Sequence, residues 1–110
     1  MSINSQNTFT AEAIRDTNLH NGEIVFNGDF VIKTLIIENG LNQDVTLQCQ
    51  ASAHEDFSNS FNVGSSFNAS ASTDSYQTCD SYFPYWRITA QCGSSPSSGA
   101  LTVIVLGVEG

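Results

Sequence analysis

Basic side chains are nearly absent from this sequence of 110 residues. Arg15, Lys33 and Arg87 stand against eleven acidic residues, which gives a formal net charge of −8. Nucleic-acid binding depends on clustered Lys and Arg that displace counterions from phosphates, and anionic lipid attracts the same clusters. Three scattered cations form no such cluster, so we expect neither nucleic acid nor a membrane among the partners.

Long apolar runs are also missing. No stretch approaches the roughly 20 residues that span a bilayer, and the first ten residues lack the charged and apolar regions of a secretory signal. We therefore expect synthesis in the cytoplasm without a signal peptide. A hydrophobic content of 40% excludes wholesale disorder, and the length fits one domain. Residues 1–20 precede the first clear strand, which predicts an N-terminal arm over 1–20 and a single domain over 21–110.

Motifs for catalysis, metal binding or cofactor binding are not found. The cluster His54, Glu55 and Asp56 lies in a polar loop, which predicts a solvated turn, with a weak divalent-cation site as the alternative. His20 stands alone beside an Asn-Gly pair and is expected to be exposed. We therefore expect no enzymatic activity, no cofactor, no catalytic residues and no metal site.

Three cysteines, at positions 49, 79 and 92, show no metal-ligand spacing. Without a secretory signal, reduced and buried thiols are the first expectation. The alternative is a Cys49–Cys92 bridge that leaves Cys79 available to a partner.

Helix signals are confined to residues 10–19, which could hold a turn or two. Strand signals fill the rest of the chain. Two β-rich runs, 23–26 and 29–32, flank Asn27-Gly28, the dipeptide that a type I′ turn favours, and predict a hairpin. The second run continues to Glu38 with apolar residues on both faces, which predicts a central or doubly covered strand.

Strict alternation marks two further strands. Residues 44–51 place Val45, Leu47, Cys49 and Ala51 on one face, and residues 84–92 place Trp86, Ile88, Ala90 and Cys92 on one face. We expect Trp86 to fill the core. Residues 61–70 form a broken strand pair with a turn or bulge at Gly64, and a short strand is expected around 76–79. These seven or eight strands predict an all-β antiparallel β-sandwich, of jelly-roll or Ig-like type.

The last strand, residues 100–108, is apolar on both faces and would be an aggregation hazard if exposed. It is therefore either central or covered by a partner. This pattern predicts a subunit interface formed by Leu101, Val103, Ile104, Val105, Leu106, Tyr82 and Tyr85. The two tyrosines also form a possible ligand patch for a glycan.

Residues 82–107 (YFPYWRITAQCGSSPSSGALTVIVLG) resemble the C-terminal part of small β-sandwich proteins encoded in phage and prophage structural regions. Residues 36–52 and 61–70 fit the same layout. The resemblance implies a virion component of head-decoration, tail or fibre type, made in the host cytoplasm. Jelly-roll subunits of bacterial surface filaments and spore appendages are also similar, but their cysteine-bearing connector is missing from residues 1–20.

These observations favour a non-enzymatic structural subunit that assembles with itself or onto a larger particle, with a virion as its location. A carbohydrate- or host-surface-binding module is the first alternative. A self-assembling filament subunit at a bacterial cell or spore surface is the second. Expected partners are copies of the chain, other particle subunits and, in the first alternative, a glycan.

Overall fold

The computed structural model describes residues 3–26, 32–79 and 83–108, and nine strands run through these ranges. They are β1 (Ile3–Glu12), β2 (His20–Asn21), β3 (Val25–Phe26), β4 (Ile32–Asn39), β5 (Val45–Ser52), β6 (Phe61–Ala69), β7 (Thr73–Cys79), β8 (Tyr85–Cys92) and β9 (Leu101–Val108). The described residues contain no helix, and therefore none that could cross a membrane.

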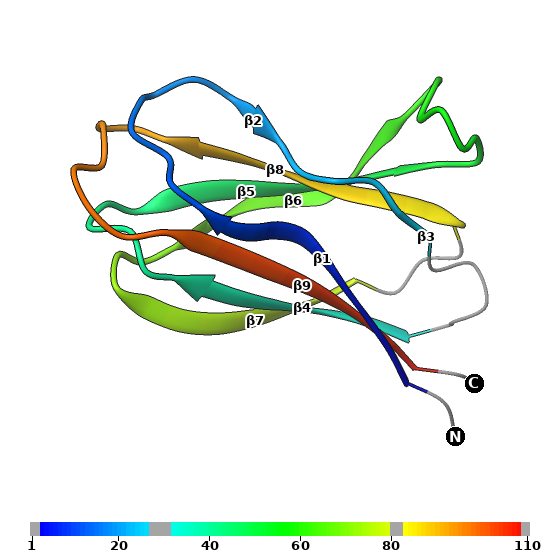
Figure 1. Ribbon diagram of the computed structural model, residues 1–110. Helices are drawn as coiled ribbons and strands as arrows, with labels where there is room; N and C mark the ends of the chain where they lie inside the picture. The colour runs from blue at the N-terminus through cyan, green and yellow to red at the C-terminus, as the bar shows by residue number, and fades with distance from the viewer. Residues whose placement is uncertain (1–2, 27–31, 80–82, 109–110) are drawn as a thin grey trace.

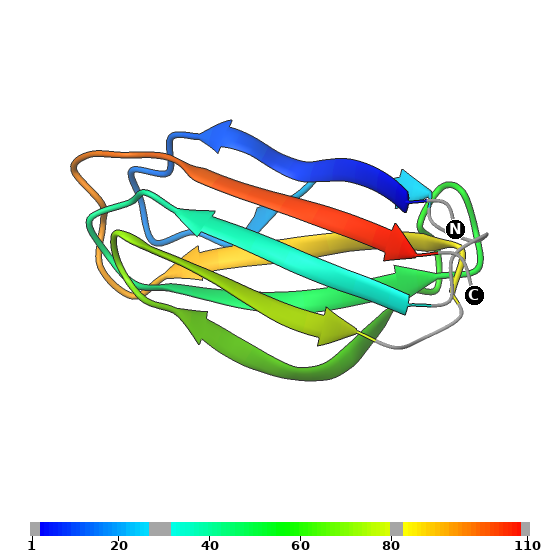
Figure 2. The ribbon, with the colours of Figure 1, turned by 90° about the horizontal axis from the view of Figure 1, so that it is seen from below.

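The strands form two antiparallel sheets stacked face to face (Figures 1 and 2). Sheet A has the order β1-β9-β4-β7. Sheet B has the order β2-β8-β5-β6, and β3 also pairs with β8. This arrangement confirms the predicted all-β antiparallel sandwich.

The core lies between the sheets and follows the alternation of the sequence. The inward residues predicted on β5 and on β8 are all at most 2% exposed. Trp86 is 1% exposed, and its indole Nε1 donates a hydrogen bond to the carbonyl oxygen of Phe83 at 2.7 Å. Trp86 is thus a core residue with a satisfied polar group, as predicted.

Both two-faced strands are central in sheet A, as the sequence required. Strand β9 lies between β1 and β4, and β4 lies between β9 and β7. Their inner side chains, including Leu35, Ile37 and Val103, are 0–1% exposed. Central positions satisfy the hydrogen-bonding groups on both edges of these apolar strands, which removes the hazard of an open edge.

The predicted hairpin of residues 23–32 is wrong in its strand pairing. Strand β3 pairs with β8 in sheet B, whereas β4 pairs with β7 and β9 in sheet A. The Asn27-Gly28 turn lies outside the described residues. Alternation identifies a strand but not its partner, and here the two strands belong to different layers.

The N-terminal segment differs from the free arm that was expected. Strand β1 pairs with β9 from Ile3 to Glu12, with register shifts on both sides of Phe9. The predicted helical turns at 10–19 are absent, because β1 occupies this segment as far as Glu12 and a loop follows. Thr8 and Phe9 are neighbours in the chain, yet both are buried. A bulge at this point breaks the period of two, so the sequence lacked the usual strand pattern.

Candidate functional site

An apolar stripe crosses the outer face of sheet A. We use this name for Ile36, Tyr76, Ile104 and Leu106. Ile36 is the register partner of both Tyr76 on β7 and Ile104 on β9, so these three side chains form one row across the strands. Tyr76 is 73% exposed, and the other three are partly exposed. Figure 2, which looks onto sheet A, shows no described element covering this face.

The predicted interface residues separate into two groups. Leu101, Val103 and Val105 face the core of their own subunit and are 0–1% exposed. Ile104 and Leu106 lie on the outer face of β9, within the apolar stripe. Tyr82 lies outside the described residues.

Tyr85 belongs to the opposite side of the molecule. It lies on the outer face of sheet B, where its ring packs against Phe26 with 5.3 Å between the ring centroids. The structure therefore does not bring Tyr85 together with the apolar stripe. Phe26 is 46% exposed, so this aromatic pair remains partly accessible.

An amide face covers the rest of the outer side of sheet B. We use this name for the outward side chains of four strands: Asn21, Thr46, Gln48, Gln50, Asn62, Asn68, Arg87, Thr89 and Gln91. Arg87 is its one charged member. The guanidinium Nε donates to Oε1 of Gln50 at 2.8 Å, and its central carbon lies 4.6 Å from the ring centroid of Phe57. These two contacts hold Arg87 in place.

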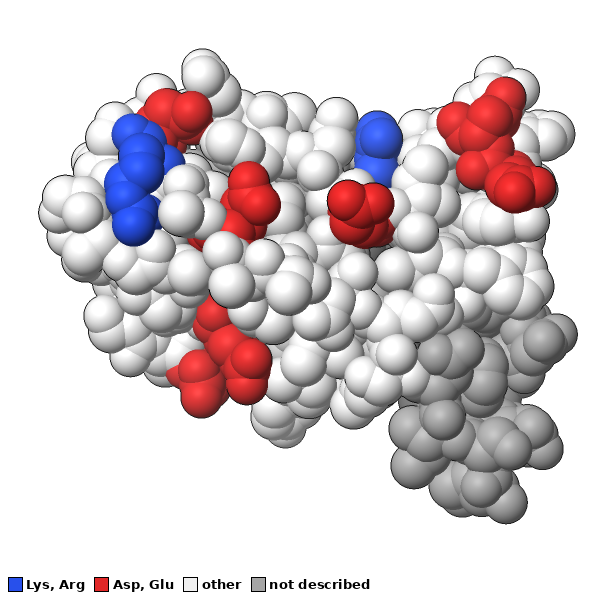
Figure 3. All heavy atoms as spheres, viewed as in Figure 1, with Lys and Arg blue, Asp and Glu red and all other residues white. Residues whose placement is uncertain are grey.

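The surface in view in Figure 3 is largely uncharged, and its acidic groups gather at the upper right and at the lower left, with a few others between them. The guanidinium of Arg15 is bound to the backbone, because its Nη1 donates hydrogen bonds to the carbonyl oxygens of Ile14 and Gly99. Most of the face in view therefore offers uncharged contacts, and its charge is concentrated in a few acidic groups.

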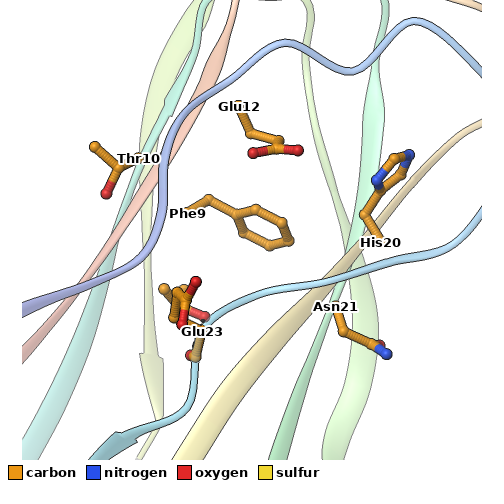
Figure 4. Close-up of a pocket in the computed structure, with 7 residues that line it drawn as sticks. Phe9, Thr10, Glu12, His20, Asn21 and Glu23 are labelled. Atoms are coloured by element: carbon orange, nitrogen blue, oxygen red, sulfur yellow. Dashed lines mark hydrogen bonds between the residues drawn. The ribbon is translucent and has the colours of Figure 1, made fainter.

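A small cavity of about 330 Å³ lies between β1 and β2. Figure 4 shows the ring of Phe9 at its centre, with Glu12 and His20 on one side and Glu23 on the other. The described residues hold no group of three His, Cys, Asp or Glu side chains arranged to bind a metal ion. The cavity therefore combines two carboxylates and an imidazole without a metal-binding geometry.

His20 is half-buried in strand β2, whereas the sequence predicted an exposed residue. Its Nε2 lies 2.7 Å from Oδ1 of Asp16. The hydrogen bond from His20, and next the backbone N–H of Asn18, lower the pKa of Asp16 below its ordinary value. Together these bonds fix the loop that leads into β2.

The cluster His54, Glu55 and Asp56 lies exposed in the turn between β5 and β6, as the sequence predicted. The backbone N–H of Ser58 donates to the carboxylate of Asp56 at 3.0 Å and lowers its pKa. A hydrogen bond between the Asp56 side chain and the backbone thus closes the turn, as is common in surface turns.

Cys49 and Cys92 are buried at 2% and 1% exposure, as expected. Cys92 pairs with Val45, four residues along β5 from Cys49. That separation is about 13 Å, and a disulfide spans at most about 7 Å between Cα atoms. The alternative of a Cys49–Cys92 bridge is therefore wrong. Burial, and next the negative charge of Asp16, raise the pKa of the Cys92 thiol.

Two buried polar residues escaped the sequence analysis. Thr8 joins β1 to sheet B, and Asn39 joins loops that lie about 30 residues apart in the chain. Nothing in the sequence marks either residue, because their partners are distant backbone groups.

No protein-family model matches the chain, and no curated protein matches it. Solved structures with a similar fold include those of two proteins, XepA and PirA. The PBSX exported protein XepA has a TM-score of 0.74 and 15% identity over 96% of this chain. PirA has a TM-score of 0.53 and 13% identity over the same share of this chain and 91% of its own. This chain spans 37% of the length of XepA. At these identities the likeness establishes the fold alone. The matching region is part of the longer XepA chain and nearly all of the PirA chain.

Proposed function

We propose that this protein is a non-enzymatic structural subunit of a phage-associated particle, and that copies of it associate through the apolar stripe on sheet A. The observation that carries the proposal is an uncovered row of side chains on sheet A. It is formed by Ile36 and Ile104 on the two central strands and Tyr76 on the edge strand β7.

Solvent-facing positions of a β-sandwich are normally polar. Here three strands place large apolar side chains next to one another on the outer face. Contiguous exposed apolar surface with a polar border marks protein contacts, and the border is formed by Glu38 and Asp74. Contact with a second copy would remove this surface from water and stabilise a small domain by mass action.

The phage association draws on two likenesses. The sequence of residues 82–107 resembles phage structural proteins, and the fold resembles that of XepA, an exported protein of the phage element PBSX. Both likenesses support the proposed association with a phage. A role as a decoration, tail or fibre subunit is the function that fits a small domain with an uncovered apolar face.

A pair of tyrosine variants tests the proposal. Tyr76→Ala removes the most exposed member of the apolar stripe, and Tyr85→Ala removes a tyrosine from the opposite outer face as the matched control. Light scattering after size-exclusion chromatography should show a lower mass for Tyr76→Ala than for the wild type, and an unchanged mass for Tyr85→Ala. Equal masses for both variants and the wild type would place any association elsewhere.

A further inference from the structure

We infer that the amide face of sheet B is a binding site for a neutral glycan. This inference does not depend on the proposed assembly, because the amide face and the apolar stripe lie on opposite sides of the sandwich. The ligand class follows from the chemistry of the face, the way its side chains are held, and its charge.

The amide face is a regular array of hydrogen-bonding groups. Strand pairing places its members in three rows, and each row crosses the sheet. The rows are Thr46, Gln91 and Asn68; Gln48, Thr89 and Asn21; and Gln50, Arg87 and Asn62. Neighbours within a row are about 5 Å apart and successive rows about 7 Å apart. Amides and hydroxyls both donate and accept, which matches the hydroxyl groups that a sugar presents at similar spacing.

The amides are held at one end and open at the other. Nε2 of Gln48 donates to the carbonyl oxygens of Cys49, Val63 and Gly64. This leaves its Oε1 without a hydrogen-bond partner among the described residues. Side chains already fixed in this way lose little conformational entropy when a ligand binds.

The row around Arg87 is fixed in the same manner. Nε2 of Gln50 donates to Oδ1 of Asn62 at 3.0 Å, while its Oε1 accepts from Arg87. The amide of Asn62 and the two terminal nitrogens of Arg87 have no further partner within the described ranges. A guanidinium fork held in this position can donate to two adjacent hydroxyl groups of one sugar ring.

Thr89 provides a separate indication of a ligand. It is 5% exposed and lies on the outer face between Asn21 and Gln48, its register partners. Its hydroxyl has no hydrogen-bond partner among the residues that the structure describes. Buried hydroxyl groups are normally satisfied, and a ligand lying on this face can complete the bond.

Charge decides between neutral and acidic glycans. The face holds one positive charge, and the whole chain carries a net charge of −8, which repels an acidic polymer. The partly exposed rings of Tyr85 and Phe26 adjoin the Arg87 row. They offer an apolar surface for the C–H groups of a neutral sugar ring.

A glycan array tests this inference directly. The labelled wild-type protein is applied to immobilised neutral oligosaccharides and, on the same array, acidic ones. Binding confined to neutral oligosaccharides is the expected result. Binding to no oligosaccharide, or only to acidic ones, would overturn the inference.

Matched variants locate the binding on the protein. Arg87→Gln should weaken binding to the best neutral oligosaccharide by about tenfold or more, whereas Arg15→Gln, on another part of the surface, should leave it unchanged. Thr46→Val removes a hydroxyl that makes no hydrogen bond with another described residue, and it should weaken binding about threefold or more without lowering the melting temperature. Equal binding by the wild type, Arg87→Gln and Thr46→Val would exclude the amide face as the site.

Discussion

Asn39 shows how much a single buried amide can hold together. Its Nδ2 donates to the carbonyl oxygens of Gln43, Ala69 and Ser70, and its Oδ1 accepts from the backbone N–H of Leu41. Asn39 is 1% exposed. It therefore ties the end of β4 to the end of β6, and tertiary contacts hold the turn that follows β4.

Replacing Asn39 by Ala should lower the free energy of unfolding by about 2–4 kcal/mol, because several buried backbone groups lose their partner. Asn42→Ala is the matched control. Asn42 lies exposed in the loop that follows β4, and among the described residues its side chain bonds only with Ser97. Its replacement should therefore lower the free energy of unfolding by less than about 1 kcal/mol. Urea denaturation measures both, and equal losses would contradict this role for Asn39.

The Asp16–His20 pair predicts a pH dependence. The pKa of Asp16 is lowered in the folded protein from the ordinary value of 3.8, mainly by its hydrogen bond with His20. A carboxyl group whose pKa is lowered by folding stabilises the folded protein at pH values above 3.8. This stabilisation is lost as the pH falls through the pKa that the group has in the folded protein. Asp16→Asn should therefore make the melting temperature less sensitive to pH below about 4. A variant whose acid profile runs parallel to that of the wild type would refute the linkage.

At the scale of elements, strand β1 of sheet A is fastened to sheet B through one threonine. Thr8 Oγ1 donates to the carbonyl oxygen of Glu23 at 2.8 Å and accepts from the backbone N–H of Ile88 at 3.3 Å. The site also requires glycine at position 22, where a Cβ atom would lie 2.2 Å from Thr8 Oγ1. The edge of sheet A is in this way joined to β8 of sheet B.

Thr8→Val keeps the shape of the side chain and removes its hydrogen bonds. The backbone N–H of Ile88 and the carbonyl oxygen of Glu23 then each lose a hydrogen-bond partner. This loss should lower the free energy of unfolding by about 1–3 kcal/mol. Amide hydrogen exchange should also accelerate along β1. Thr10→Val, at an exposed position of the same strand, is the control. Slow exchange along β1 in both variants would show that the hydroxyl does not hold the strand.

Strands β5 and β8 were predictable because alternating residues meet a single core throughout their length. The same alternation placed Gln48, Gln50 and Arg87 on the outside. It gave no sign that the two strands are neighbours, because pairing depends on contacts between distant segments. The amide face therefore emerges only in the folded structure.

Strand β1 was not predictable for a different reason. Its bulge buries two consecutive residues, Thr8 and Phe9, and most of its other described side chains are polar. The pattern of the segment consequently resembles that of a polar arm. The apolar stripe was foreseeable in part. Apolar residues on both faces of β9 indicated an apolar outer surface, but not that Tyr76 of β7 would extend it.

At the scale of the whole molecule, the sandwich presents two outer faces of contrasting chemistry. The apolar stripe of sheet A suits contact between copies, and the amide face of sheet B suits a hydrated, uncharged ligand. A subunit that associates through one face keeps the other turned outward. The two proposals are therefore compatible in one particle, and each has its own variant, Tyr76→Ala for association and Arg87→Gln for the glycan.

Sedimentation velocity of the wild-type protein over about 1–300 µM tests the central claim most directly. Association through the uncovered apolar stripe should give a mass above the 11.8 kDa of the single chain, with the larger species increasing with concentration. Tyr76→Ala, run in parallel, should shift this distribution towards 11.8 kDa. A single species of 11.8 kDa at every concentration would contradict association between copies through sheet A.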